Sequence, residues 1–130
     1  MGLDMYLTGE KRLWADRGPG KGLTQDGYKV ESVHLELGYW RKHPNLHGYI
    51  VTNFAGGVDE CQDIDLGEGN LEELIAAVAD DELPQTSGFF FGESDGSEKD
   101  GDLRILRAAL AWLRTEEDGV ARSVTYRASW

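Results

Sequence analysis

The amino-acid sequence predicts a single compact domain, residues 1–130, of α+β (mixed α/β) type. Stretches in which apolar and polar residues alternate are typical of half-buried strands, and stretches with apolar residues every three to four positions are typical of amphipathic helices. Both patterns occur here and interleave. A chain of 130 residues has the size of one ordinary domain and can bury a core without disulfides. The predicted order is β-β-α-β-α-β-α-β, with about five strands and three helices.

The strands are predicted by alternation and by the turn residues around them. Residues 15–27 contain Gly-Pro-Gly and predict a loop, and 93–102 is a polar loop. The aromatic segment GFFFG, with a glycine at each end, predicts either a buried strand or a packed turn. The predicted strands cover residues 3–14, 28–37, 61–66, 88–92 and 120–130.

Three helices are predicted by their apolar stripes and their N-terminal signals. The first begins at Pro44, because the missing N–H of proline costs nothing in a first turn. The second begins with a capping box in which Asn70 is the N-cap and Glu73 reaches back. The third covers residues 103–116, with Asp102 as its N-cap.

The acidic residues are concentrated in the middle third of the chain. The net charge is −11, yet residues 1–58 carry six acids and seven bases, and residues 103–130 carry three acids and five bases. Residues 59–102 carry fifteen acids and a single base, Lys99. Such a negative field repels nucleic acid and anionic membranes and favours a partner with a basic surface. The alternative interpretation is a solvated surface that only confers solubility.

The cysteine content and the hydropathy of the sequence indicate in which cellular compartment we expect the protein. A single cysteine, Cys61, excludes an internal disulfide, so nothing demands an oxidising compartment. We find no signal-peptide pattern at the N-terminus and no apolar run of about 18 residues. We therefore expect a cytoplasmic protein that does not bind a membrane.

Four short motifs together resemble a widespread family of small proteins from tailed phages and prophages. They are the opening MGLDMYL, YWRK followed by a helical histidine, LP…GFFFG, and the C-terminal SW, and in this order they span most of the chain. The resemblance implies a phage or prophage origin, a host-cell location and a single-domain fold, and it implies no mechanism. The recurrent residues of the family fall on Asp4, Tyr39, Trp40, Arg41, Lys42, His47, Cys61, Pro84, Gly88, Phe89, Phe90, Phe91, Gly92, Ser129 and Trp130.

Two departures from this family pattern stand out. Family members have an asparagine at the position of Pro44, whereas here the asparagine is Asn45. Family members also carry tyrosines after GFFFG, where this chain has SDGSEKDGD. The exchanged, acidic loop suggests a partner particular to this lineage.

The stretch GYWRKHPNLHGYI, residues 38–50, is one hypothetical ligand site. Two cations just before a helix start, two aromatic rings and a histidine one turn into the helix are residue types that bind nucleotide-like or phosphorylated small molecules. The alternative is structural: aromatic rings in the core, an arginine paired with an acid and a histidine bonded internally. The residues of this predicted ligand site are Tyr39, Trp40, Arg41, Lys42 and His47.

Metal and cofactor signals are weak. His43 and His47 are four residues apart, with Asp59 and Cys61 as further possible zinc ligands, but no second Cys or His pair has ligand spacing. The loop at 93–102 does not match the EF-hand register, and GFFFG lacks the lysine of a phosphate loop. We expect no metal and no cofactor, and the sequence contains no G-x-S-x-G motif.

The favoured hypothesis is a small acidic phage-type accessory protein that acts by protein binding and is not an enzyme. It would occupy a host nucleic-acid-binding or defence protein through acids spaced like backbone phosphates, as an anti-CRISPR-like inhibitor does. The alternative is a small-molecule-binding protein or enzyme that uses the predicted ligand site; the oligomeric state is left open. The predicted partner-binding residues are Asp63, Asp65, Glu68, Glu72, Glu73, Asp80, Asp81, Glu82, Asp95, Asp100 and Asp102.

Overall fold

A four-stranded antiparallel sheet forms one layer of the computed structural model, which describes residues 2–86 and 94–130. Its strands are β1 (Asp4–Leu13), β4 (Ser32–Arg41), β5 (Ile64–Asp65) and β6 (Val120–Ser129), in the order β4-β1-β6-β5. β1 therefore lies inside the sheet and pairs antiparallel with both long neighbours, and β5 pairs antiparallel with β6. This central strand places residues from the two ends of the chain next to each other.

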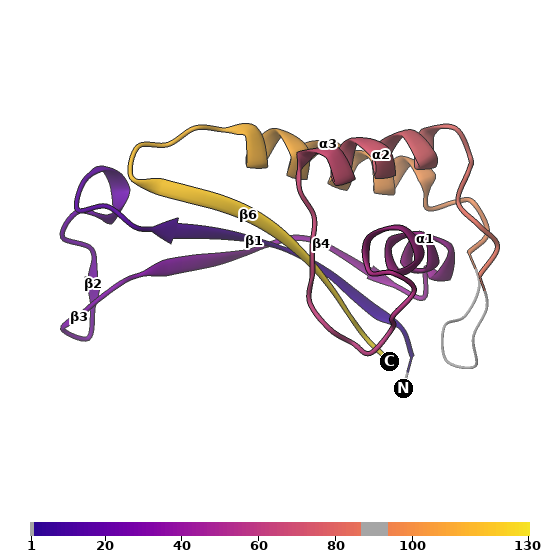
Figure 1. Ribbon diagram of the computed structural model, residues 1–130, viewed down its shortest axis with the longest axis horizontal. Helices are drawn as coiled ribbons and strands as arrows, with labels where there is room; N and C mark the ends of the chain where they lie inside the picture. Colours follow the sequence, from indigo (N-terminus) through magenta and orange to yellow (C-terminus); the bar gives the residue numbers. More distant parts are fainter. Residues whose placement is uncertain (1, 87–93) are drawn as a thin grey trace.

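A small hairpin extends one end of the molecule. It consists of β2 (Thr24–Gln25) and β3 (Tyr28–Lys29), and the 3-10 turn η1 (Gly18–Gly20) lies close by (Figure 1). The two residues of its turn, Asp26 and Gly27, have φ angles of 54° and 84°. An Asp-Gly pair with positive φ at both positions is typical of the tight turn that suits the twist of two antiparallel strands.

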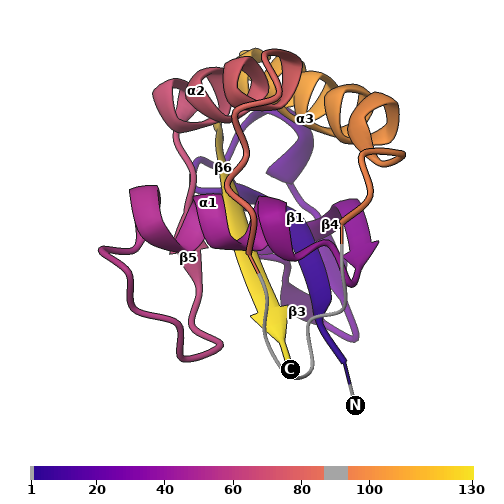
Figure 2. The same cartoon turned by 90° about the vertical axis from the view of Figure 1, so that its right-hand side faces the viewer.

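Three helices cover one face of the sheet. They are α1 (Pro44–Phe54), α2 (Glu68–Ala79) and α3 (Lys99–Arg114), and α2 and α3 lie side by side (Figures 1 and 2). These two helices are antiparallel, because Arg114 at the end of α3 pairs with Glu68, and Lys99 at its start pairs with Asp81 just after α2. The other face of the sheet carries no described helix.

The core lies between the sheet and the helices. Alternation along the strands points Met5, Leu7 and Tyr126 inward, each at most 1% exposed. Every such buried apolar side chain contributes about 1.5–3 kcal/mol relative to full exposure. The helices contribute Leu46, Ile50, Leu71, Leu74, Val78 and Leu106 to the same cluster.

The α+β prediction is confirmed, and so are its strands at 3–14 and 120–130 and its helix beginning at Pro44. The strand predicted at 28–37 is displaced: the chain forms β3, turns, and then continues in β4 as far as Arg41. The strand predicted at 61–66 is reduced to two residues. The segment at 88–92 lies outside the described residues.

Two predicted helix starts are wrong. The second helix begins at Glu68 with Gly67 as its N-cap, and the Asn70 side chain accepts the Gly67 N–H at 2.9 Å instead of acting as the N-cap itself. The third helix begins at Lys99, so Asp102 lies inside its first turn. The polar loop at 93–102 thus ends earlier than its composition indicated.

Candidate functional site

The structure does not gather the predicted ligand site at one place. Because β4 continues to Arg41, its alternation turns Tyr39 and Trp40 to opposite faces of the sheet. Trp40 is 7% exposed in the core, whereas Tyr39 is 43% exposed on the helix-free face and donates its hydroxyl proton to Asp4. The prediction that both rings are core residues is therefore right for Trp40 and wrong for Tyr39.

The other members of this set are also separated. Arg41 and Lys42 are exposed, and Lys42 adopts a left-handed backbone with φ of 55° at the turn into α1. His47 is 1% exposed and hydrogen bonded inside the protein. A ligand in contact with the cations would therefore not reach the His47 imidazole, and for Trp40 and His47 the structure favours the structural interpretation.

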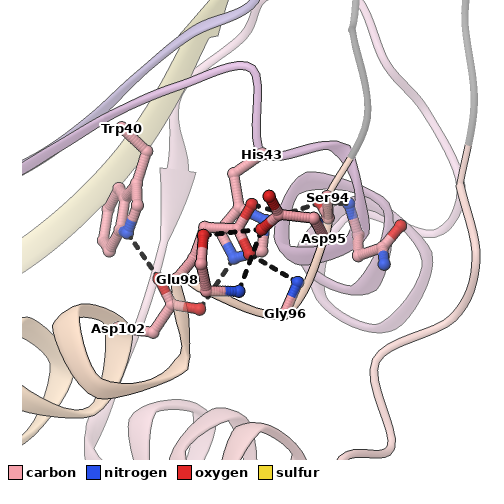
Figure 3. A network of polar contacts seen from close by, with 9 residues as sticks. Trp40, His43, Ser94, Asp95, Gly96, Glu98 and Asp102 are labelled. Carbon is pink, nitrogen blue, oxygen red and sulfur yellow. Dashed lines mark hydrogen bonds and ion pairs between the residues drawn. The ribbon is translucent and has the colours of Figure 1, made fainter.

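A different histidine, His43, lies at the centre of a buried polar network. Its Nδ1 is 2.7 Å from the Ser94 hydroxyl, and its Nε2 is 2.7 Å from Oδ2 of Asp102. The Trp40 indole donates to the other carboxylate oxygen, Oδ1, at 2.8 Å (Figure 3). We call these four residues the His43 network.

The donors and acceptors of the His43 network determine the position of each proton. The Asn45 backbone N–H donates to the Ser94 oxygen at 3.2 Å, which directs the Ser94 proton towards Nδ1 of His43. The Asp102 carboxylate only accepts, so the Nε2 of His43 carries the proton in that hydrogen bond. The result is a continuous chain from serine to imidazole to carboxylate.

Local structure explains how these residues meet. Trp40 points inward near the end of β4, and His43 directly precedes α1 as its N-cap residue. The His43 side chain does not cap α1; the Ser94 hydroxyl, from the segment before α3, accepts the Asn45 N–H instead. Asp102 is 1% exposed on the inner side of α3. The network therefore ties β4, α1 and α3 together.

A second network has the same order of groups around His47. Its Nδ1 lies 2.6 Å from the Tyr126 hydroxyl and its Nε2 lies 2.9 Å from Asp59, which also accepts the Trp130 indole N–H at 3.2 Å. Burial, and then the nearby Asp59 and Cys61, raise the pKa of the Tyr126 hydroxyl far above its usual value. Tyr126 therefore keeps its proton at neutral pH.

A cavity adjoins the His43 network. Its volume is about 140 Å³, and its lining includes His43, Ser94, Asn45 and Asp102. Asn45 is fixed there, because its Oδ1 accepts the Thr86 N–H at 2.9 Å. The Ser94 hydroxyl and the imidazole therefore border a space that a small group can enter.

Sequence reasoning missed this arrangement. It considered His43 only as a zinc ligand and gave no role to Ser94, which carries no local motif. His43 is separated by 51 residues from Ser94 and by 59 from Asp102, so only the tertiary fold brings them together. Among the described residues, no group of three or more His, Cys, Asp or Glu side chains is arranged to hold a metal ion.

Ten of the eleven predicted partner-binding acids are exposed. Asp102 is the exception: it is buried in the His43 network, so its assignment to a partner surface is wrong. Some of the ten have cationic or hydroxyl partners that reduce their field. Asp63 pairs with Arg127, and Asp65 accepts a hydrogen bond from the Thr125 hydroxyl. Glu68 and Glu72, on α2, both pair with Arg114.

The least neutralised acids lie where α2 ends and α3 begins, and we call them the acidic end. Lys99, paired with Asp81 at 3.1 Å, is the one cation among the described residues from 79 to 102. Figure 1 places this end of the helix pair away from the β2–β3 hairpin. The acidic end consists of Asp80, Asp81, Glu82, Asp95 and Asp100, all exposed.

The backbone at the end of α2 holds three of these acids in a fixed turn. The Glu82 N–H donates to the Ala77 carbonyl at 2.8 Å and the Asp81 N–H to the Val78 carbonyl at 3.3 Å, which is the Schellman pattern. Asp81 occupies its left-handed position with φ of 55°, where glycine or asparagine is favoured. The three carboxylates therefore project from a defined helix end.

Further charges surround this surface. Hydrogen bonds from the Ser97 hydroxyl and backbone lower the pKa of Asp95, which keeps that carboxylate ionised. Burial, followed by the negative charges of Glu73 and Glu82, raises the pKa of Tyr49 on α1. The negative field of α2 therefore extends towards α1.

Two further findings concern membrane spans and related proteins. Within residues 2–86 and 94–130, no helix combines the length and the apolar content needed to cross a bilayer. Comparison of the chain with protein-family models, with curated proteins and with solved structures gave no match. The resemblance to small phage and prophage proteins therefore stays a prediction from the four motifs.

Proposed function

We propose that this protein is a phage- or prophage-type accessory protein that binds a basic host protein through the acidic end. The partner is a nucleic-acid-binding or defence protein, and the carboxylates occupy the surface that would otherwise hold a phosphate backbone. Asp80, Asp81 and Glu82 are consecutive, and Asp95 and Asp100 come from the neighbouring segment and helix. One cation, Lys99, accompanies these five acids.

The observation that carries this proposal is that three of the five acids, Asp80, Asp81 and Glu82, lie at the C-terminal end of α2, where they destabilise the fold. The C-terminus of a helix carries a partial negative charge, so each anion there costs about 0.3–1 kcal/mol. The last turn of α2 contains no basic residue that would offset this cost. Acids retained at a position that lowers stability are typical of a functional surface, because function and stability often conflict there.

The partner class follows from the charge. A rigid anionic surface attracts a cationic one, accelerates association and fixes its orientation, and the attraction weakens as salt screens it. Such a surface repels nucleic acid, so we propose no direct nucleic-acid binding. The exposure of Tyr39 and the burial of Trp40 and His47 give no support to the alternative ligand site.

Affinity capture from host lysate tests this proposal with two matched variants. The first neutralises the helix end as Asp80→Asn, Asp81→Asn and Glu82→Gln. The control removes the same charge at exposed positions near the opposite end of the molecule, as Asp16→Asn and Asp26→Asn with the exposed Glu31→Gln.

We expect the wild type and the control to retain one basic protein that elutes as salt rises, and the first variant to lose it. Retention of the same protein by the helix-end variant, or a partner whose retention ignores salt, would contradict the proposal. The two variants have equal net charge, so a general charge effect would weaken both alike.

A further inference from the structure

We propose that the His43 network is also a nucleophilic site, with Ser94 as the nucleophile and His43 as its general base, for short neutral acyl esters. This activity is chemically distinct from partner binding, and its cavity borders the acidic end, because Asp81 lines it. The proposal rests on the hydrogen-bonded order of the groups: Ser94 hydroxyl to Nδ1 of His43 at 2.7 Å, and Nε2 of His43 to Asp102 at 2.7 Å. A hydroxyl, a base in contact with it and a carboxylate that orients the base make an activated nucleophile.

The protonation pattern suits this role. The Asn45 N–H occupies a lone pair of the Ser94 oxygen and directs the hydroxyl proton to His43. The Asp102 carboxylate holds the tautomer in which Nδ1 is free to accept, and it stabilises the imidazolium that forms. The Trp40 indole donates to the other oxygen of Asp102 at 2.8 Å, so both carboxylate oxygens are hydrogen bonded (Figure 3).

The reaction consists of two acyl-transfer steps. The Ser94 oxygen attacks the ester carbonyl carbon while its proton passes to Nδ1 of His43; the carbon–alkoxide bond breaks, and His43 returns the proton to the leaving alkoxide. Water then attacks the acyl–Ser94 ester, giving its proton to His43. The acyl–oxygen bond breaks, the carboxylic acid leaves, and Ser94 regains the proton.

The surroundings define the substrate class. The adjoining cavity of about 140 Å³ has room for a short acyl group of acetyl to butyryl size. Asp81 and Glu98 line it together with one cation, Lys99, so a neutral ester is favoured over an anionic one. The Asn45 side chain also lines it, and its amide is held by the Thr86 N–H as a donor for the developing oxyanion.

A fluorophosphonate probe followed by peptide mass spectrometry tests the nucleophile on the full chain. We expect the label on Ser94 of the wild type, no label on the Ser94→Ala variant and unchanged labelling of Ser97→Ala, the matched exposed serine of the same segment. We also expect faster hydrolysis of p-nitrophenyl acetate than of p-nitrophenyl octanoate. A wild type that carries no label on Ser94, or equal labelling of Ser97, overturns the proposal without any need for a variant.

Asp102→Asn separates catalysis from a structural role. The asparagine amide accepts from Trp40 with its oxygen and donates to Nε2 of His43 with its nitrogen, which moves the imidazole proton to Nδ1. We expect a 10²- to 10⁴-fold slower labelling rate, the usual contribution of a general base, and a His43 ¹⁵N NMR signature of the other tautomer. The switched tautomer with an unchanged labelling rate would overturn the proposal.

Discussion

The buried carboxylate of Asp102 should be among the most stabilising polar groups of the domain. The side chain is 1% exposed and accepts hydrogen bonds from the Trp40 indole and the His43 imidazole at 2.8 and 2.7 Å. Replacing it by alanine leaves two buried donors without an acceptor. Hydrogen bonds to a charged group are worth about 1.5–3 kcal/mol each. We therefore expect Asp102→Ala to lower the free energy of unfolding by about 3–5 kcal/mol, the range found when one partner of a buried pair is removed.

Asp100→Ala is the matched control for this loss. Asp100 lies in the same first turn of α3 and is exposed, so both variants remove one charge from the helix N-terminus. The helix-dipole contribution, about 0.3–1 kcal/mol, is therefore common to both. Only Asp102→Ala also breaks the buried contacts to Trp40 and His43.

Urea unfolding followed by circular dichroism at neutral pH measures both variants. Domains of this size are stable by about 5–15 kcal/mol, so a loss of about 3–5 kcal/mol moves the midpoint well outside experimental error. Equal midpoints for Asp100→Ala and Asp102→Ala would refute the reasoning, because they would show that the two buried donors find other acceptors at no cost.

Three further predictions concern stability. Asp81→Asn should stabilise the domain by up to about 1 kcal/mol, because asparagine suits the left-handed end of α2 and removes a charge from the helix C-terminus, whereas the exposed Asp81–Lys99 ion pair that it breaks contributes little; thermal unfolding measures it. Hydrogen bonds from Lys11 and Arg122 lower the pKa of Glu117, so the ionised Glu117 stabilises the folded state above pH 4.5, and this stabilisation is lost as the pH falls further. The difference in unfolding free energy between wild type and Glu117→Gln, measured by urea titration, should therefore shrink below pH 4.5. Gly38→Ala places a Cβ against the Cγ2 methyl group of Ile105 on α3, too close for a normal contact, and should cost about 1–3 kcal/mol. Gly69→Ala is helical and meets open space, so it should gain up to about 1 kcal/mol; calorimetry measures both variants. Three results would contradict these arguments: an Asp81→Asn variant less stable than wild type, a stability difference for Glu117→Gln that does not change with pH, or a Gly38→Ala variant as stable as wild type.

The sequence predicted the framework because the framework depends on local patterns. Alternation in residues 3–14 and 120–130 and the proline at position 44 predicted β1, β6 and the start of α1. Helix starts were less predictable, since Asn70 satisfies a backbone N–H from inside α2 in place of capping its first residue.

The candidate site was not predictable for a physical reason. The predicted strand ended at Leu37, so the prediction allowed Tyr39 and Trp40 to face the same ligand. In the structure β4 continues to Arg41 and turns the two rings to opposite faces of the sheet. Period-two alternation extended by four residues would have shown this separation. The contact between His43 and Ser94 depends on tertiary packing across 51 residues, for which no local spacing rule exists.

The structure was needed to decide which of the predicted acids lie on the surface. Composition placed Asp102 with the other acids of the middle third, and only the position of α3 over β4 shows that this carboxylate is internal. The antiparallel arrangement of α2 and α3 then concentrates the least neutralised acids at one end, because Arg114 neutralises Glu68 and Glu72 at the other end.

Competition with nucleic acid tests the central claim most directly. The captured host protein is first saturated with labelled duplex DNA. The acidic protein described above is then titrated in, and fluorescence anisotropy reports how much DNA stays bound to the host protein. We predict complete displacement at a concentration that rises with salt, and no displacement by the Asp80→Asn, Asp81→Asn, Glu82→Gln variant. A ternary complex in which DNA stays bound, or equal displacement by that variant, would contradict the claim that the acidic end occupies a nucleic-acid surface.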